Sequence, residues 1–405
     1  MTGPNGFPSA YIIDILRTPI GRFGGALANV RPDDLATEVI KALFSRNPRI
    51  PLDSIEDVIF GAANQAGEDN RNVARMAGLM AGLPVEVGGV TVNRLCASSL
   101  QAIMDGARGL MLNEGSAYIA GGAESMTRAP FVTAKSTSAF SRKVETYDTT
   151  IGWRFVNPVL ADHYYPFSMG ETAENVAKKW QISREAQDEF AHESQSRYNK
   201  AQAAGKFNDE LISIEIPQRK GAPLSVTEDE HPRLSSIEKL NSLKPAFVED
   251  GTVTAGNSSG INDGSAAAIM ASDELTRKHD LKPMARVVAM ATAGVAPDIM
   301  GIGPVPATRK ALKRAGLKIN DIDLVELNEA FAAQSIACIQ ELGLDPSIVN
   351  VNGGSIALGH PLGASGARIS ATLLHEMKRR NVRYGLATMC VGVGQGAAII
   401  YENLV

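Results

Sequence analysis

The chain has 405 residues, of which 44% are hydrophobic and 21% are charged, and its formal net charge is −4. This length allows two or three domains with a large core, and the composition is that of an ordinary globular protein. The charge balance gives no argument for nucleic acid or an acidic membrane surface as a partner. No stretch of about 18 apolar residues occurs, so no membrane span is expected.

Cysteine usage and the start of the chain indicate the compartment. The three cysteines are widely spaced and cannot form a disulfide framework, which suits a reducing cytosol. Residues 1–14 lack both a basic start and a long apolar run, so no signal peptide is expected. We therefore predict a cytoplasmic protein.

The first predicted section covers residues 1–125. Residues 40–61 have the pattern of an amphipathic helix, a polar turn and a short apolar strand. GVTVNRLCASS (89–99) predicts a strand that ends at Asn93 and turns into a helix, and SAYIAGGAE (116–124) predicts another apolar strand.

An insertion of different character follows at residues 126–255. It is polar and aromatic, and we interpret it as a loop domain that covers the substrate or its carrier. Residues 182–205 indicate an amphipathic helix pair, in which Ser183 is the expected N-cap of the second helix.

The last section, residues 256–405 with a core from about 283, repeats the pattern of the first. Residues 308–328 parallel 40–61, IVNVNGGSIALGH (348–360) parallels 89–99, and YGLATMCVGVGQG (384–396) parallels 116–124. Strands that alternate with helices predict parallel units. We expect an α/β protein with two duplicated βαβ-rich halves in a layered α/β/α/β/α core. A pseudo-twofold axis would bring the equivalent turns of the two halves together.

Three small-residue turns carry the candidate chemistry. Cys96 lies where a helix begins, which favours the thiolate, and a thiolate nucleophile needs a base and a proton carrier. His360 and Cys390 could fill these roles. An isolated cysteine is more often a small buried hydrophobe, and we interpret Cys338 in this way. The other histidines are expected at surface or loop positions: 163, 192, 231, 279 and 375. No cluster has metal-ligand spacing, so no metal is predicted.

Eight segments occur in a fixed order along nearly the whole chain: RTPIGRFGGAL, NRLCAS, GGAESM, MGETAENVA, GTVTAGNSSGINDGSAA, LNEAFA, GHPLGASGAR and CVGVGQG. In these segments the chain resembles the thiolase family. The resemblance implies the thiolase fold and CoA-dependent cleavage of a 3-ketoacyl-CoA to acetyl-CoA and a shortened acyl-CoA, or the reverse Claisen condensation. It also implies a homo-oligomer, a dimer or a dimer of dimers (a homotetramer).

The resemblance assigns a role to each motif residue. Cys96 attacks the ketone carbon and becomes acylated, and His360 activates it and helps to bind the enolate oxygen. Cys390 exchanges the proton with the acetyl carbon, and Asn328 holds a water in the first oxyanion hole. The backbone N–H groups of Cys96 and Gly392 form the second hole.

The same resemblance implies CoA as co-substrate, with no permanently bound cofactor. Ser259 in a small-residue loop would contact the pantetheine arm, and Arg233 matches the arginine near the nucleotide end. Apolar positions that match the lining of the CoA tunnel are Met169, Phe247, Ala255 and Phe331.

Two departures bear on the substrate. Ser168 stands where short-chain members usually have His, and Ser99 where many of them have Gly. Residues 61–84 and 148–158 look like the branch that acts on 3-oxoadipyl-CoA in aromatic-compound degradation. Its substrate carries a free carboxylate, for which Arg154 and Arg128, as well as loop hydroxyls, are candidate partners.

Several alternatives stay open at this point. The substrate could be acetoacetyl-CoA (an acetyl-CoA C-acetyltransferase) or a fatty-acid 3-ketoacyl-CoA. An acyl-carrier-protein-dependent condensing enzyme of the same fold usually pairs its nucleophile with two His or with His and Asn, so Cys390 argues against it. A non-catalytic lipid-binding protein of this fold is disfavoured by the presence of Cys96, His360 and Cys390.

Overall fold

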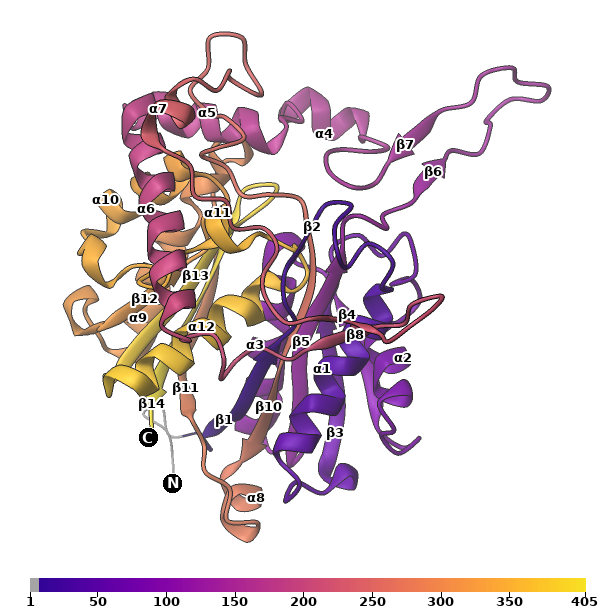
Figure 1. Ribbon diagram of the computed structural model, residues 1–405, viewed down its shortest axis with the longest axis vertical. Coiled ribbons are helices and arrows are strands. Elements are labelled where there is room, and N and C mark those ends of the chain that lie inside the picture. Colours follow the sequence, from indigo (N-terminus) through magenta and orange to yellow (C-terminus); the bar gives the residue numbers. More distant parts are fainter. Residues whose placement is uncertain (1–6) are drawn as a thin grey trace.

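The computed structural model describes residues 7–405 as one large mixed sheet covered by helices (Figure 1). The expectation of a chain start without a signal peptide falls partly on residues 1–6, which lie outside the described residues. The ten strands of the sheet are β1 (Ala10–Arg17), β2 (Gly21–Arg22), β3 (Ile55–Gly61), β4 (Gly88–Val92), β5 (Ala117–Ser125), β10 (Asn262–Ser272), β11 (Ala285–Gly294), β12 (Leu324–Leu327), β13 (Tyr384–Val391) and β14 (Gln395–Asn403).

The strand order confirms the internal duplication. It runs β12-β13-β14-β11-β1-β10-β5-β3-β4, so that each half has the same arrangement read outward from the centre, and β2 pairs with β10. The halves meet where β1 pairs with β11, and only Tyr11–Arg286 and Ile12–Ala285 are paired there. The strand β10 follows the insertion in sequence but lies between β1 and β5. The division of the chain into domains at residues 125 and 255 stays a prediction.

The prediction of parallel units holds only for the outer strands. β3 is parallel to β4 and β5, and β12 is parallel to β13. The four central strands β1, β10, β11 and β14 make antiparallel pairs. The turn from β13 to β14 is too short for a crossover, so these two strands must be antiparallel. The strand expected near Asn352 is also missing within the described residues: residues 348–352 contribute a single bridge, Val325–Val349.

Helices form three layers around the two halves of the sheet, as expected for the layered core. α1 (Pro32–Arg46) and α2 (Val73–Met80) cover the outer face of the N-terminal half, and α9 (Pro304–Ala315) and α10 (Ala332–Leu342) cover that of the C-terminal half. α3 (Ser98–Met111) and α12 (Ser365–Arg380) lie between the halves.

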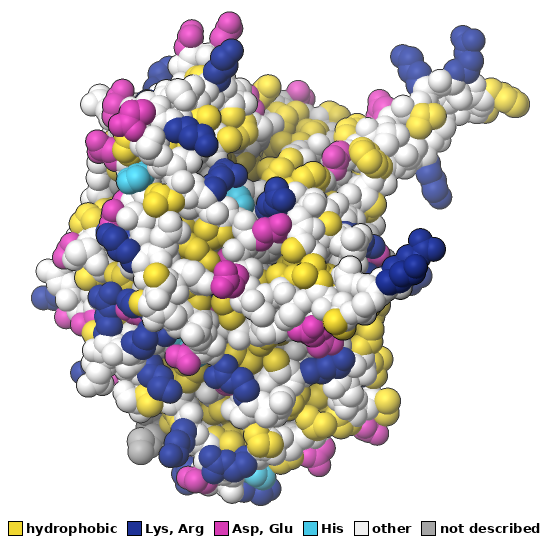
Figure 2. All heavy atoms as spheres, in the orientation of Figure 1, with side chains coloured by type: hydrophobic (Ala, Val, Ile, Leu, Met, Phe, Trp, Pro, Cys, Tyr) yellow, Lys and Arg dark blue, Asp and Glu magenta, His cyan; other side chains and the backbone are white. Residues whose placement is uncertain are grey.

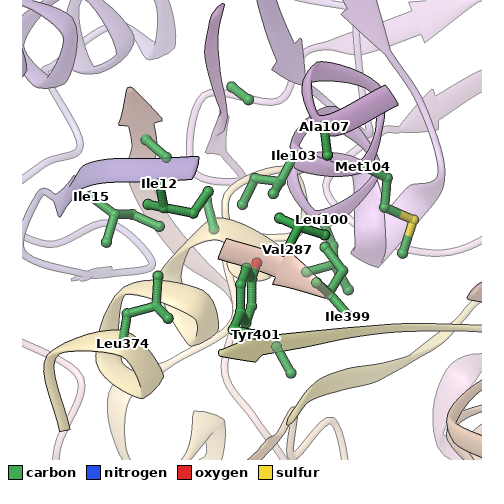
Figure 3. Packing of buried hydrophobic residues seen from close by; sticks show 14 of the residues in the cluster. Ile12, Ile15, Leu100, Ile103, Met104, Ala107, Val287, Leu374, Ile399 and Tyr401 are labelled. Carbon is green, nitrogen blue, oxygen red and sulfur yellow. The ribbon is translucent and has the colours of Figure 1, made fainter. Parts of the chain in front are cut away.

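The central layer contains the largest apolar cluster (Figure 3). Leu100 and Ile103 of α3 and Leu374 of α12 point toward Ile12 of β1 and Tyr401 of β14. Along each strand, every second residue faces this central layer and the residues between them face the outer helices. The strands are therefore apolar on both faces. The sulfur of Cys338 on α10 is buried and donates to the carbonyl of Gly301 at 3.3 Å, so this cysteine has the structural position expected for it.

The two central helices approach each other closely. A Cβ at Gly366 of α12 would lie 2.3 Å from the backbone nitrogen of Leu100 on α3, so only glycine fits there. Beside this contact, the Ser99 hydroxyl accepts a hydrogen bond from the Ala367 N–H at 2.9 Å. Both helices begin directly after the turns that carry the candidate nucleophile and the candidate base.

The insertion supplies the remaining elements: β6 (Phe131–Thr133), β7 (Thr146–Asp148), α4 (Pro158–His163), α5 (Met169–Lys179), α6 (Arg184–Ala203), β8 (Ile214–Ile216), β9 (Leu224–Val226) and α7 (Ile237–Asn241). The β6–β7 hairpin projects away from the body, whereas α5, α6 and α7 lie over the C-terminal half (Figure 1). The expected cap is confirmed, because the Ser183 hydroxyl accepts from the Ala186 N–H at 3.2 Å. Two short helices outside it are α8 (Asp273–Lys278) and α11 (Ser355–Leu358).

Two of the histidines expected at surface or loop positions are buried. His375 lies on the inner helix α12, and its Nε2 is 3.1 Å from the carbonyl oxygen of Ile15. His231 lies in a loop but is only 6% exposed. Across residues 7–405, no helix is long and apolar enough to cross a membrane, and no three of the metal-binding residue types gather as a metal site would require.

Candidate active site

A cavity of about 430 Å³ opens at the carboxyl ends of β3, β5 and β13. This edge of the sheet is where ligands bind in many α/β proteins. Figure 2 shows an apolar hollow between the projecting hairpin and the helical part of the insertion. Residues that line the cavity include Asn64, Cys96, Glu124, Thr149, Arg154, Ser168, Met169, Leu362 and Gly392.

Cys96 lies in a 3-10 turn, Leu95–Ala97, directly before α3. The turn is held locally: the Leu95 N–H donates to Asn93 Oδ1 at 2.8 Å, and the Ser98 hydroxyl donates to the Leu95 carbonyl at 2.6 Å. Leu95 adopts a φ of 47°, a left-handed conformation that is strained for a leucine. The strain lies beside the predicted nucleophile Cys96, which is half-buried in the cavity wall.

The expectation that the helix start would favour the thiolate is wrong for the resting site. Burial raises the pKa of the Cys96 thiol to about 11, and the N–H groups of Gly392 and of Cys96 itself only partly oppose this effect. Loss of water disfavours the charged form more strongly than two backbone donors favour it. The resting group is therefore a thiol, and attack requires a base.

Hydrogen bonds fix the tautomer of His360. Its Nδ1 lies 2.6 Å from the Ser365 hydroxyl, which itself donates to the carbonyl of Pro361 at 2.8 Å. Because the hydroxyl proton is engaged, Ser365 accepts from Nδ1–H, and Nε2 retains its lone pair. The His360 N–H donates to Asn262 Oδ1 at 2.9 Å, which holds the backbone after Gly359 (φ 104°).

Asn328 follows β12 and points its amide group at His360. The Ser355 hydroxyl donates to Asn328 Oδ1 at 2.6 Å and accepts from Arg368 Nη2 at 2.6 Å. The Asn328 amide nitrogen therefore faces His360 Nε2, at 3.4 Å. Arg368 is in turn paired with Glu326 at 3.4 Å, and this whole chain of groups is buried.

The electrostatic environment keeps the imidazole neutral. Burial, followed by the positive charge of Arg368, lowers the pKa of His360 to about 3. A neutral imidazole whose Nε2 carries no proton can accept one from a thiol. Cys96 and His360 are thus both uncharged in the resting protein.

Cys390 and Gly392 lie where β13 ends. Cys390 is fully buried, and burial, with a smaller contribution from Cys96, raises the pKa of its thiol well above the ordinary value. Gly392 lines the cavity together with Cys96, and its N–H favours the charged form of the Cys96 thiol. The turn that follows passes through Val393 and Gly394, both with positive φ. Of the five predicted catalytic residues, Cys96 and Gly392 line the cavity, Cys390 lies two residues before Gly392, and Asn328 contacts His360.

The residues predicted to contact CoA divide into two groups. Met169 lines the cavity and packs with Phe331 in the apolar cluster that includes Cys390, and the Phe331 ring meets that of Phe247 edge-on at 6.2 Å. The Ser259 N–H donates to the carbonyl of Ala330, next to Phe331, at 3.0 Å.

Arg233 and Ala255 line a separate hollow of about 200 Å³. Arg233 Nη2 donates to the Ala255 carbonyl at 2.7 Å, so the arginine is tied to the loop that leads to Ser259. No residue lines both this hollow and the cavity at Cys96 within the described part of the chain.

Family models for the two thiolase domains match nearly all of the chain: the N-terminal domain matches residues 10–274 and the C-terminal domain matches residues 281–403. The chain belongs to the thiolase family. It is 56% identical over 398 residues to the beta-ketoadipyl-CoA thiolase of Escherichia coli, which is 98% of this chain and 99% of that protein.

Solved thiolase structures share the fold. The acetyl-CoA acetyltransferase of Bacillus anthracis is 42% identical, with a TM-score of 0.92 over 99% of this chain and 100% of that one. Human mitochondrial 3-ketoacyl-CoA thiolase in complex with CoA is 41% identical, with a TM-score of 0.91 over 98% of each chain.

Several residues of this thiolase site were not assigned from sequence. Ser365 and Ser355 orient His360 and Asn328, and Glu124 accepts the N–H groups of Ala63, Asn64 and Gly363 at 2.8–3.1 Å. Burial raises the pKa of Glu124 to about 7. Glu124 lies in the GGAESM segment, and both serines lie in or beside the GHPLGASGAR segment, which is the signal that could have indicated them.

Proposed function

We propose that the chain cleaves 3-oxoadipyl-CoA with free CoA to give succinyl-CoA and acetyl-CoA, and that it can run the reverse condensation. The observation that carries the thiolase chemistry is that Cys96 and Gly392 line one cavity, with the buried Cys390 thiol two residues before Gly392. A neutral His360 lies two residues before Leu362, which lines the same cavity. The similarity to beta-ketoadipyl-CoA thiolases supports the choice of substrate.

In the first half-reaction, His360 Nε2 takes the thiol proton as the Cys96 sulfur attacks the ketone carbon. The N–H groups of Cys96 and Gly392 stabilise the developing oxyanion, because backbone donors fixed in a cavity cost no reorganisation during the reaction. The bond between the α and β carbons then breaks, and the succinyl group stays on Cys96.

The leaving group is the enolate of acetyl-CoA, which needs a proton at carbon. Burial keeps the Cys390 thiol protonated, so that it can deliver this proton. His360 and Asn328, which would hold a water, stabilise the enolate oxygen. A second CoA then attacks the thioester at Cys96, and its thiol proton passes to the Cys390 thiolate. The bond between Cys96 and the succinyl group breaks, succinyl-CoA is released, and the Cys96 thiolate takes back its proton from His360.

CoA is a co-substrate in this proposal, and no permanently bound cofactor or metal is required. Ser259, Met169, Phe247 and Phe331 would line the pantetheine path, with Ala255 and Arg233 nearer to the nucleotide end. We further propose a cytoplasmic homo-oligomer, a dimer or dimer of dimers, with acyl-CoA and CoA rather than nucleic acid or membrane as partners.

A thiolysis assay tests the proposal. Loss of the 3-ketoacyl-CoA enolate absorbance on addition of CoA is followed with 3-oxoadipyl-CoA, acetoacetyl-CoA and a long-chain 3-ketoacyl-CoA. We expect the highest kcat/KM with 3-oxoadipyl-CoA. Cys96→Ser should abolish turnover, because a serine hydroxyl has no comparable anionic form near neutral pH.

The outcomes separate the rival functions. A preference for acetoacetyl-CoA would indicate an acetyl-CoA C-acetyltransferase, the activity named for the Bacillus anthracis relative. A preference for long chains would indicate a fatty-acid thiolase, and absence of turnover with all substrates a non-catalytic lipid-binding protein. Intact mass after incubation with acetyl-CoA should show one acetyl adduct on the wild type and none on Cys96→Ser.

A further inference from the structure

One loop of the insertion reaches the cavity that contains Cys96. Residues 149–154 form a continuous part of its wall, and Arg154 is half-buried there. Of the described residues that line the cavity, Arg154 alone carries a positive charge.

Arg154 lacks an acidic partner. Within residues 7–405 no carboxylate forms an ion pair with it, and its Nη2 makes only a long hydrogen bond, 3.4 Å, to Asn64 Oδ1. Arg128, the other arginine considered from sequence, is instead held by two bonds of 2.6 Å to Glu68 and does not line the cavity. Arg94, close to Cys96 in sequence, is bound to the side-chain carbonyls of Gln101 and Gln395.

The loop that carries Arg154 is fixed from both ends. The Asn64 amide donates to the carbonyl and the hydroxyl of Thr149 at 3.0 and 3.1 Å. The Trp153 indole N–H donates to the Phe167 carbonyl at 3.0 Å, directly before the cap of α5. The guanidinium is therefore presented on a positioned backbone, which lowers the entropy lost when it binds a ligand.

The acidic group of the cavity favours a cationic partner for an anionic substrate. Glu124 also lines the cavity, and in its charged form it would disfavour a substrate carboxylate beside it. The three backbone N–H groups that Glu124 accepts are already engaged and cannot serve the substrate. The guanidinium of Arg154, held only by the weak bond to Asn64, is available.

We infer that Arg154 binds the terminal carboxylate of the substrate and thereby selects CoA esters of 3-oxo dicarboxylic acids. This inference rests on the proposed function and deepens it. In 3-oxoadipyl-CoA only two methylene groups separate the attacked carbonyl from the carboxylate, so both ends lie within the one cavity. The planar guanidinium can donate two parallel hydrogen bonds to a carboxylate. On binding the substrate, Arg154 would give up its hydrogen bond to Asn64 for these two bonds.

The test compares two substrates of equal chain length. 3-Oxohexanoyl-CoA has a methyl group where 3-oxoadipyl-CoA has the carboxylate. Arg154→Gln should lower kcat/KM for 3-oxoadipyl-CoA by roughly ten- to a hundredfold, the value of a charge-assisted contact, and should change kcat/KM for 3-oxohexanoyl-CoA little. Arg154→Lys should restore part of the loss, because it keeps the charge without the planar fork.

Arg128→Gln is the matched control, since it removes an arginine of the same region that is bound to Glu68 outside the cavity. It should keep the wild-type preference. If Arg154→Gln keeps that preference too, or slows both substrates equally, the inference is overturned while the proposed function stands. If the wild type cleaves 3-oxohexanoyl-CoA but not 3-oxoadipyl-CoA, the substrate assignment fails and the inference fails with it.

Discussion

At the scale of single residues, the site combines three groups that burial keeps uncharged. The pKa of both thiols is raised and that of His360 is lowered, so Cys96, His360 and Cys390 are all neutral at rest. An uncharged cluster needs no counter-ion in the cavity, and charge arises only as the substrate reacts. The two thiols differ in position: Cys96 lines the cavity, whereas Cys390 is fully buried behind it.

This difference leads to a prediction for Cys390→Ala. The variant should still form the acetyl adduct on Cys96, but it should lose most of the solvent deuterium exchange into the methyl group of acetyl-CoA. A positioned acid–base group typically contributes about 10²–10⁴-fold, so a loss of that size is expected. Exchange is measured by mass spectrometry of acetyl-CoA.

Cys338→Ala is the control, since it removes another buried thiol, which lies on α10 and does not line the cavity. Its exchange rate should equal that of the wild type. Wild-type exchange in Cys390→Ala would show that another group handles the proton, and His360 would be the next candidate to test.

The sequence suggests candidate residues for the site, but it does not indicate their protonation states. Cys96, His360 and Cys390 stand out because a reactive side chain in a small-residue turn is visible along one chain segment. The pKa of Cys96 depends on how much protein surrounds the sulfur, which no local pattern records. Ser355 was missed for a similar reason, because its hydrogen bond to Asn328 forms only when α11 lies beside the end of β12. Ser365 lies only five residues from His360, but the hydrogen bond depends on how the turn between them folds.

At the scale of elements, the contact between α3 and α12 positions both halves of the site. Cys96 precedes α3, and Ser365, which holds His360, is the first residue of α12. The close approach at Gly366 therefore helps to place the predicted nucleophile and the predicted base relative to each other.

Gly366→Ala should destabilise the protein and impair catalysis together. The added Cβ would lie 2.3 Å from the backbone nitrogen of Leu100, which cannot move away as a flexible side chain would. Overpacking of this kind typically costs about 1–3 kcal/mol. A urea titration gives the stability, and kcat/KM for thiolysis should fall because α12 moves His360.

Gly106→Ala on α3 is the matched control. A Cβ there would lie 3.0 Å from the sulfur of Met270, the far end of a flexible side chain, and alanine favours the helix by up to about 1 kcal/mol. Stability and activity should both stay near wild type. Equal effects of the two substitutions would mean that the helix contact does not set the site geometry.

Individual elements were more predictable than their pairing. The helix–turn–strand repeats at residues 40–61 and 308–328 correspond to α1–β3 and α9–β12. The strand directions in the centre were not predictable from alternation, because β10 returns to the N-terminal half only after the long insertion. Residues 348–352 have the apolar pattern of a strand but form only a single β-bridge. The neighbouring strand β12 is short, so it offers few backbone groups with which they could pair.

At the scale of the whole molecule, the described part of the chain buries titratable groups that link stability to pH. His231 is one of them, and its ring lies against the backbone of Gly260 in the loop predicted to contact CoA. Burial, followed by the charge of Arg233, lowers the pKa of His231 to about 4. The unfolded chain, in which histidine titrates near its ordinary pKa of about 6.5, therefore binds a proton that the folded protein excludes.

His231→Asn should make the protein less sensitive to acid. Between about pH 6.5 and pH 4 only the unfolded state protonates this histidine, so folding loses about 1.4 kcal/mol per pH unit as the pH falls through this range. From pH 7.5 to 5, the wild type should therefore lose about 2 kcal/mol more unfolding free energy than His231→Asn, measured by urea titration at both pH values. The variant's own packing loss is present at both pH values and cancels in this difference.

His163→Asn, which alters an exposed histidine, is the control, and its unfolding free energy should fall by as much as that of the wild type between the two pH values. Parallel pH profiles for the wild type and His231→Asn would mean that the buried ring is accommodated in its charged form, with Asp229 and Glu230 as the acidic groups near enough to balance it.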